Sequence, residues 1–261
     1  MTLVLTELSK FGVAMAADSA VTFPGGRVFI GAQKLLPVKK INAGISVWGN
    51  GEVNGLDADV WLQNFIDTKV KLNMSLWDMA NNLADELNKA FGKPIKERMG
   101  VHVAGFDEKN GKLGPAFYHV HNGHYHFEYI NGVVEESPGE DPPTRKFIAN
   151  EDCPPRIYFD NQTYLTRNGD FSVFALLYDQ IEPFFSKVKQ MTGIEFPYPL
   201  SLANRGEYLR FWVDTVVGIY RLSNARKRIL PQPDTAGDAS IGGPVTVLTI
   251  SELGIESFYT K

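Results

Sequence analysis

The chain has 261 residues, of which 44% are hydrophobic and 12% aromatic, enough to bury a sizeable core. Its formal net charge is -4 and its Lys and Arg residues are scattered, which argues against nucleic acid as a partner. No apolar run reaches the roughly 18 residues that a membrane helix needs. Cys153 is the single cysteine and the N-terminus carries no basic leader. We therefore expect one cytoplasmic domain over residues 1–261, with no membrane contact.

The first third of the sequence predicts strands followed by helices. Residues 2–9 and 13–18 are short apolar runs joined by a tight turn, so the chain begins inside a sheet. A Pro-Gly-Gly turn at 24–26 leads to a second strand pair that ends with residues 41–49. Two helices are predicted next, over residues 56–70 and over 75–91. Ser75 and Asp78 resemble a capping box at the start of the second helix, and Gly92 ends it.

The remaining sequence returns to strands and then to helices. Asn122-Gly123 lies inside an apolar stretch and predicts a two-residue hairpin. Residues 135–156 are acidic and rich in proline, which is typical of a long loop or insertion. The other predicted elements are strands at 99–107, 114–130 and 242–250, and helices at about 171–191 and 207–224. Because helices and strands segregate along the chain, an α+β fold is favoured over a doubly wound parallel sheet.

The N-terminus offers a nucleophile and a base in one residue. If Met1 is removed, the new α-amine lies beside the Thr2 hydroxyl, and its pKa of about 7.7–8.0 suits proton transfer near neutral pH. Such a site needs a nearby positive charge, a carboxylate that holds it and N–H donors for an oxyanion. Lys34, Asp18 and Gly49 supply these three parts. We expect Gly49 to lie where a strand gives way to a helix, whose N-terminus favours negative charge.

These residues and their spacing resemble a known family. The stretch from Thr2 through Asp18-Ser19 to Lys34 and Gly49 is similar to the opening of proteasome β-type subunits and of the bacterial peptidase ring that partners an unfoldase. The gaps from Thr2 to Asp18 and Lys34 match without insertion, and the gap to Gly49 is one residue longer. Two later segments, 104–107 and 114–115, resemble the family's central strands. Asp238 begins a segment that resembles the family's Asp-x-x-Ser-Gly-Gly signature.

Two positions depart from the family pattern. Ile241 stands where the signature has a supporting serine before the glycine pair, and it makes no hydrogen bond through its side chain. Ser240 is one residue away. Asp170 occupies the best placement for the serine of a Gly-Ser-Gly turn, and a carboxylate there would favour a protonated amine and weaken it as a base.

The resemblance implies a fold, an activity and partners. The fold is a four-layer αββα sandwich of two antiparallel sheets flanked by helices, as in N-terminal nucleophile (Ntn) hydrolases. The activity is hydrolysis of peptide amide bonds by a threonine peptidase without cofactors, acting on peptides or unfolded proteins. The assembly is a homo-oligomeric ring with an ATPase unfoldase as partner. The implied site residues are Thr2, Asp18, Ser19, Lys34, Gly49 and Asp238.

Two other functions remain open. An incoming amine could intercept the acyl-enzyme on Thr2 and make the protein a transpeptidase or acyltransferase. Alternatively, Ile241 and Asp170 are compatible with a non-catalytic ring or scaffold subunit. A third interpretation, dinucleotide binding by the glycines between Gly49 and Gly55, is rejected because their spacing is wrong and a helix follows where a parallel strand is required.

Four histidines flank the predicted Asn122-Gly123 turn: His119, His121, His124 and His126. In a two-residue hairpin they would share one face, opposite Tyr118 and Val120. Imidazole suits transition metals, yet no carboxylate clearly completes a site, so a solvated or interface face and a pH-sensitive contact are the alternatives.

Overall fold

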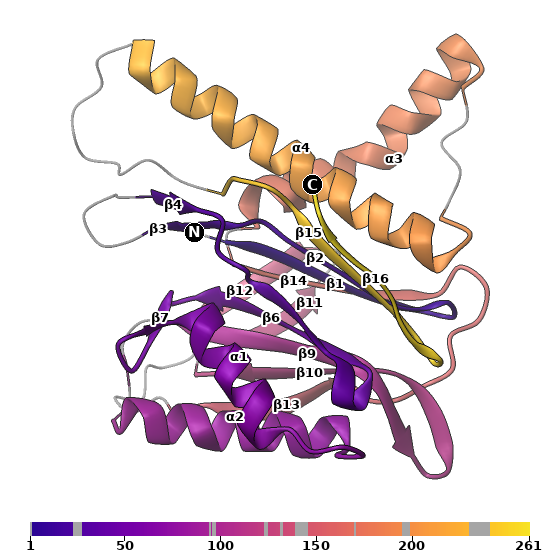
Figure 1. Cartoon of the computed structure of the whole chain (residues 1–261). Helices are drawn as coiled ribbons and strands as arrows, with labels where there is room; N and C mark the ends of the chain where they lie inside the picture. Colours follow the sequence, from indigo (N-terminus) through magenta and orange to yellow (C-terminus); the bar gives the residue numbers. More distant parts are fainter. Residues whose placement is uncertain are drawn as a thin grey trace.

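The computed structural model describes residues 2–22, 28–93, 95, 98–122, 125–130, 133–138, 146–169, 171–194, 199–229 and 241–261. Figure 1 shows two sheets that face one another, with helices on the outer side of each. All neighbouring strands in both sheets are antiparallel. This mixed architecture confirms the expected combination of antiparallel sheets and helices. No helix in these ranges is long and apolar enough to cross a membrane.

The first sheet contains the N-terminus and has the strand order β14-β1-β2-β15-β16. Its strands are β1 (Leu3–Ser9), β2 (Gly12–Ala17), β14 (Thr163–Gly169), β15 (Thr246–Ser251) and β16 (Gly254–Thr260). Every residue of β1 and β2 is buried, because both faces of the sheet are covered. This explains why the two strands appear in the sequence as continuous apolar runs rather than as an alternation.

The second sheet has the order β13-β10-β9-β6-β5. Its strands are β5 (Leu35–Val38), β6 (Ala43–Gly49), β9 (Met99–Lys109), β10 (Lys112–His121) and β13 (Ile148–Cys153). Three two-stranded pairs complete the strands: β3 (Ala20–Thr22) with β4 (Val28–Ile30), β7 (Glu52–Val53) with β8 (Leu56–Asp57), and β11 (Tyr125–Ile130) with β12 (Val133–Pro138). A 3-10 turn spans Lys39–Ile41.

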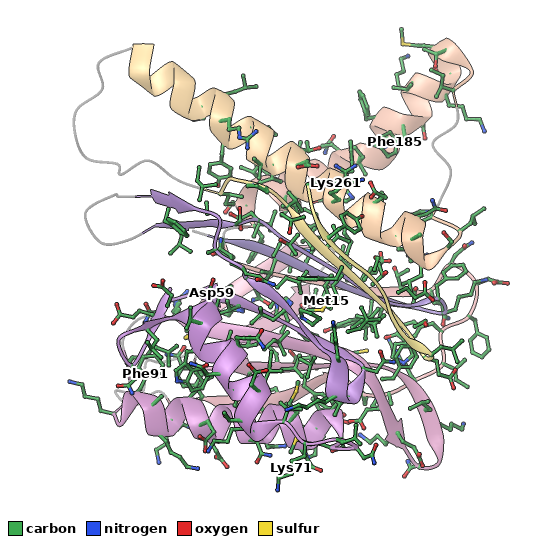
Figure 2. All side chains as sticks on the ribbon, in the orientation of Figure 1. Met15, Asp59, Lys71, Phe91, Phe185 and Lys261 are labelled. Carbon is green, nitrogen blue, oxygen red and sulfur yellow. The ribbon has the colours of Figure 1, made fainter. Side chains whose placement is uncertain are left out.

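Three apolar clusters hold the layers together. Helices α1 (Ala58–Lys69) and α2 (Leu76–Phe91) pack on the second sheet, while α3 (Ser172–Thr192) and α4 (Leu202–Ile229) pack on the first. The third cluster lies between the sheets and includes Met15, which is labelled in Figure 2. The site residues described below lie at or next to the ends of strands that border this inner layer.

The predicted limits of α2 are confirmed by its caps. The Ser75 hydroxyl accepts the backbone N–H of Asp78 at 3.0 Å, which satisfies one of the unpaired donors of the first turn. Gly92 ends the helix in the left-handed conformation, with φ of 63°, and its N–H bonds to Asn88 O.

The hairpin predicted at Asn122-Gly123 is wrong. Strand β10 pairs with β9 on one side and β13 on the other, so no edge is left for residues 125–130, which pair with β12 instead. The Asn122 side-chain oxygen accepts the backbone N–H of Met99, and the backbone N–H of Asn122 donates to Met99 O. Long-range pairing with β9 thus determines the end of β10 in place of the local turn preference.

Other boundaries also differ from the sequence prediction. Residues 148–153, expected to be part of a loop, form an edge strand of the second sheet. Helix α4 begins at Leu202, five positions before the predicted 207, and α1 begins at Ala58 after the short β7–β8 pair. Strands β14 and β16 were not predicted, although both carry the β-branched and aromatic residues typical of strands.

A buried ion pair joins the first sheet to α4. Arg205 donates to the Glu7 carboxylate at 2.6 Å, and the two side chains are 2% and 5% exposed. Burial raises the pKa of Glu7, and the guanidinium of Arg205 opposes that rise. The carboxylate is therefore stable in this position only while its partner is present.

We expect Arg205→Met to lower the free energy of unfolding by about 3–5 kcal/mol, because Glu7 is left as a buried carboxylate without its guanidinium. Adding Glu7→Leu should restore most of that loss. Urea denaturation of the wild type, both single variants and the double variant measures the coupling. Lys10→Met, which removes an exposed ion pair with Asp160, is the control and should change stability little. A double variant as unstable as Arg205→Met would contradict the prediction.

Candidate active site

The Asp18 carboxylate, just after β2, accepts four hydrogen bonds, one from its own turn and three from other segments of the chain. Its Oδ1 accepts the backbone N–H of Leu3 and the ammonium of Lys34, each at 2.9 Å. Its Oδ2 accepts the N–H groups of Ala20 at 3.2 Å and Gly242 at 3.0 Å. The Asp18 side chain is fully buried. A buried carboxylate requires such partners, so the four segments are held at one point.

Lys34 is the charged partner in this arrangement. It follows β4 in the segment that leads into β5, and only 4% of it is exposed. Besides the Asp18 carboxylate, its ammonium contacts the carbonyl oxygen of Ala20. Burial lowers the pKa of Lys34, while the charge of Asp18 and the hydrogen bond to it act in the opposite direction. The carboxylate therefore favours the charged form of the lysine.

Thr2 lies one residue before the β1 strand and is 6% exposed. The next residue, Leu3, is fixed by its bond to Asp18, so the position of Thr2 is tied to the same carboxylate. On the other side, the Thr2 carbonyl packs against Gly169 at the end of β14. Gly169 has φ of 90°, and a Cβ there would overlap the Thr2 carbonyl oxygen, so only glycine fits.

Gly49 ends β6 close to the segment before β9. It has φ of 87°, and a Cβ would overlap the carbonyl of Arg98, which accepts the N–H of Asn50 at 3.0 Å. The expectation that a helix starts here is wrong, because the β7–β8 pair intervenes and α1 begins at Ala58. Any anion bound at Gly49 would therefore interact with backbone N–H groups of this turn rather than with a helix N-terminus.

Thr2, Lys34 and Gly49 line one pocket. Part of its wall is apolar, and two carboxylates, Asp57 and Asp59, lie where α1 begins. The remaining lining residues are Val21, Phe29, Ala32, Val47, Trp48, Asn50, Gly51 and Ala58. Figure 2 shows Asp59 at the start of α1, on the side toward β3 and β4. Thr2, Lys34 and Gly49 are far apart in sequence and meet at this pocket. Asp18 does not line it and contacts it through its ion pair with Lys34.

The C-terminal glycine pair lies against Ser19. The N–H of Ser19 bonds to Gly242 O at 3.1 Å, and a Cβ on Gly243 would overlap the Ser19 hydroxyl. Among the described residues, the Ser19 hydroxyl is buried without a hydrogen-bond partner. Ile241 directs its side chain into the cluster under α4, 2% exposed, and contributes to packing rather than to the pocket. Met1, Asp170, Asp238 and Ser240 lie outside the described residues.

The described histidines form a polar layer between the sheets that the sequence prediction missed. His119 and His121 are 8% and 6% exposed, so the expected solvated face is wrong, although Tyr118 and Val120 do pack on the opposite side under α2. Ring centroids of His119 lie 4.5 Å from His121 and 5.4 Å from His102. Burial lowers the pKa of His102 and of His119 to about 3.

Hydrogen bonds fix the tautomers of His102 and His119. The Trp48 indole N–H donates to Nε2 of His119 at 3.2 Å, which leaves the Nδ1 proton facing Asp152 at 3.5 Å. His102 donates from Nε2 to the Asn168 side-chain oxygen at 2.6 Å, so its Nδ1 accepts from the hydroxyl of Thr6 at 2.9 Å. The Asn150 amide donates to His121 Nε2 at 2.9 Å. A second proton on His119 Nε2 would break the bond from Trp48, because an indole N–H can only donate.

The four histidines considered as an alternative metal face lie only partly within the described residues. His124 and the side chain of His126 lie outside the described residues, and residues 125–130 do not pair with β10. Within the described part of the chain, no group of three or more His, Cys, Asp or Glu residues is arranged to hold a metal ion. His119 is linked to the pocket through the Trp48 indole, which lines it.

Comparison with solved structures relates the fold to proteins of known structure. The chain is similar to Anbu (ancestral beta-subunit) from Yersinia bercovieri, with a TM-score of 0.50 and 14% sequence identity, over 99% of this chain and 86% of that chain. At this identity the likeness concerns the fold alone. No protein-family description and no curated protein matches the sequence.

We expect His119→Gln to reduce the pH dependence of stability. Because the folded pKa of about 3 lies below the unfolded value of about 6.5, the wild type loses stability as the pH falls from about 6.5 toward 3, by up to about 1.4 kcal/mol per pH unit for each such histidine. Glutamine can still accept the Trp48 N–H but does not titrate. Urea denaturation between about pH 7 and pH 4 tests this. If the free energy of unfolding depended on pH in the same way for both proteins, His119 would make no contribution to that dependence.

Proposed function

We propose that this chain, once Met1 has been removed, hydrolyses amide bonds of peptides with Thr2 as the nucleophile. The observation that carries the proposal is the buried Asp18–Lys34 ion pair at the wall of the pocket that Thr2 lines. A charged lysine is costly to bury, so its retention beside a residue that can act as a nucleophile suggests a catalytic use. The fold likeness to a protein named an ancestral beta-subunit agrees with the resemblance to proteasome β-type subunits.

The proposed reaction begins with attack of Thr2 Oγ on the carbonyl carbon of the substrate. The Thr2 α-amine accepts the hydroxyl proton and later donates a proton to the leaving amine, so an ester with Thr2 forms as the peptide bond breaks. The positive charge of Lys34, held by Asp18, lowers the pKa of the α-amine and keeps it available as a base. The N–H of Gly49 stabilises the oxyanion. Water then attacks the ester, and the free Thr2 and a carboxylic acid result.

The wider assembly is part of the same proposal. We propose an Ntn-type αββα sandwich over residues 1–261 that forms a homo-oligomeric ring in the cytoplasm and receives peptides or unfolded proteins from an ATPase unfoldase. Ser19 and Asp238 would support the site, with the Ser19 hydroxyl beside Gly243 as the candidate hydroxyl in place of the one that Ile241 lacks. If an amine replaces water in the second step, the same ester gives a transpeptidase or acyltransferase.

A non-catalytic ring or scaffold subunit is the second candidate function. It is favoured by the direction of Ile241, whose side chain packs under α4 and brings no hydroxyl to the pocket. The two functions differ in the state of the N-terminus, because a retained Met1 places the Thr2 nitrogen in a peptide bond and removes the base.

We expect a threonine-directed electrophile, such as a peptide epoxyketone, to add one label per chain at Thr2 in protein that has lost Met1. Intact mass spectrometry measures both the loss of Met1 and the label. Thr2→Ala should abolish labelling and peptide hydrolysis, whereas Thr68→Ala, a matched change on an exposed face of α1, should leave both unchanged. Chains without Met1 that take no label would overturn the catalytic proposal in favour of a scaffold.

A further inference from the structure

Two carboxylates in the pocket differ in what they bind. Asp59 uses both oxygens for backbone groups, accepting the N–H of Gln33 at 3.0 Å and of Val60 at 2.9 Å. Asp57 occupies the N-cap position of α1, yet its side chain makes no capping bond and is exposed. Asp59 therefore joins α1 to the segment that carries Lys34, while the carboxylate of Asp57 is left available at the pocket wall.

The charge around Asp57 is unbalanced. Glu52 lies directly opposite Asp57 in the β7–β8 ladder, and both residues are exposed. Like charges at opposed positions of antiparallel strands destabilise the pair. The positive end of the α1 helix dipole offsets part of this charge, and the ammonium of Lys34 is already neutralised by Asp18. A cation near Asp57 would relieve the repulsion.

The rest of the pocket suits a long aliphatic chain. Val21, Ala32 and Val47 contribute apolar side chains to the same lining as Thr2 and the first residues of α1. Lysine and arginine side chains place apolar methylene groups along such a surface and carry the charge at their ends. A pocket with a nucleophile at one side, apolar walls and a carboxylate that lacks a capping bond matches that chemistry.

We propose that this pocket selects a basic side chain, lysine or arginine, on the residue whose carbonyl Thr2 attacks, and that Asp57 determines this selectivity. The inference deepens the proposed function and rests on it for the role of Thr2. Recognition itself requires only the pocket: the methylene stem lies along Val21, Ala32 and Val47, and the charged group pairs with Asp57 with support from Glu52.

Binding to the non-cleaving Thr2→Ala chain tests the proposal separately from hydrolysis. The probes are two fluorescein-labelled tetrapeptides that differ only at the C-terminal residue, lysine amide or norleucine amide, which share a stem but not the charge. We expect the lysine peptide to bind about tenfold more tightly by fluorescence anisotropy, with an advantage that shrinks as salt is added. Equal affinities of the two peptides would overturn the proposal.

Variants then assign the selectivity to one residue. Adding Asp57→Asn should reduce the advantage of the lysine peptide to about twofold or less, and Asp57→Lys should favour a glutamate peptide instead. Asp85→Asn, the same change on an exposed face of α2, is the control and should keep the full advantage. Retained preference in Asp57→Asn would show that another group binds the cation and would overturn the assignment.

The two proposals fail in different ways. Labelling of Thr2 together with equal affinity for lysine and norleucine peptides would leave amide hydrolysis standing and reject a cation-selective pocket. Preference for lysine without labelling of chains that have lost Met1 would keep the pocket chemistry and reject hydrolysis, in which case the site binds basic segments without cleaving them.

Discussion

The candidate site depends on one buried carboxylate. Asp18 accepts four hydrogen bonds, which join the N-terminal strand, its own turn after β2, the segment before β5 and the C-terminal glycine pair at one carboxylate. Removing Asp18 would leave a buried lysine without its counter-charge, which costs more than the loss of a hydrogen bond. The positions of Thr2 and Lys34 are therefore consequences of the same interaction, and so is the pocket that they line.

A second constraint comes from the polar layer between the sheets. Trp48 precedes Gly49, and its indole is held by His119, which in turn faces Asp152 on the edge strand β13. This connects the turn at the pocket to the edge strand of the second sheet through the imidazole of His119, whose pKa burial lowers to about 3. The large Trp48 ring fits because Gly100, opposite it on β9, has no side chain to overlap it. The geometry of the Gly49 turn is therefore supported by packing as well as by hydrogen bonds.

The sequence predicts the elements that are determined by neighbouring residues or by a regular spacing of residues. Continuous apolar runs located β1 and β2, and Ser75 with Gly92 located both ends of α2. The spacing of Thr2, Asp18, Lys34 and Gly49 predicted which residues to examine, although their roles remain a proposal. The sequence could not show that Asn122 would end β10 by bonding to Met99, because that bond depends on a strand pairing between distant segments. The burial of His119 could not be predicted for the same reason, because the facing sheet, which covers it, comes from distant segments.

Ile241, which stands where the family signature has a serine, leaves the contact between this segment and Asp18 intact. The segment meets Asp18 through the backbone N–H of Gly242, a bond that does not depend on which side chain precedes it. Ile241 contributes apolar packing under α4, and that packing helps to hold Gly242 against the carboxylate. What the chain loses is a hydroxyl, and the buried hydroxyl of Ser19 lies next to Gly243. The charges next to Thr2 are thus set by Asp18, Lys34 and the backbone, so the proposed chemistry of Thr2 depends on whether its amine is free.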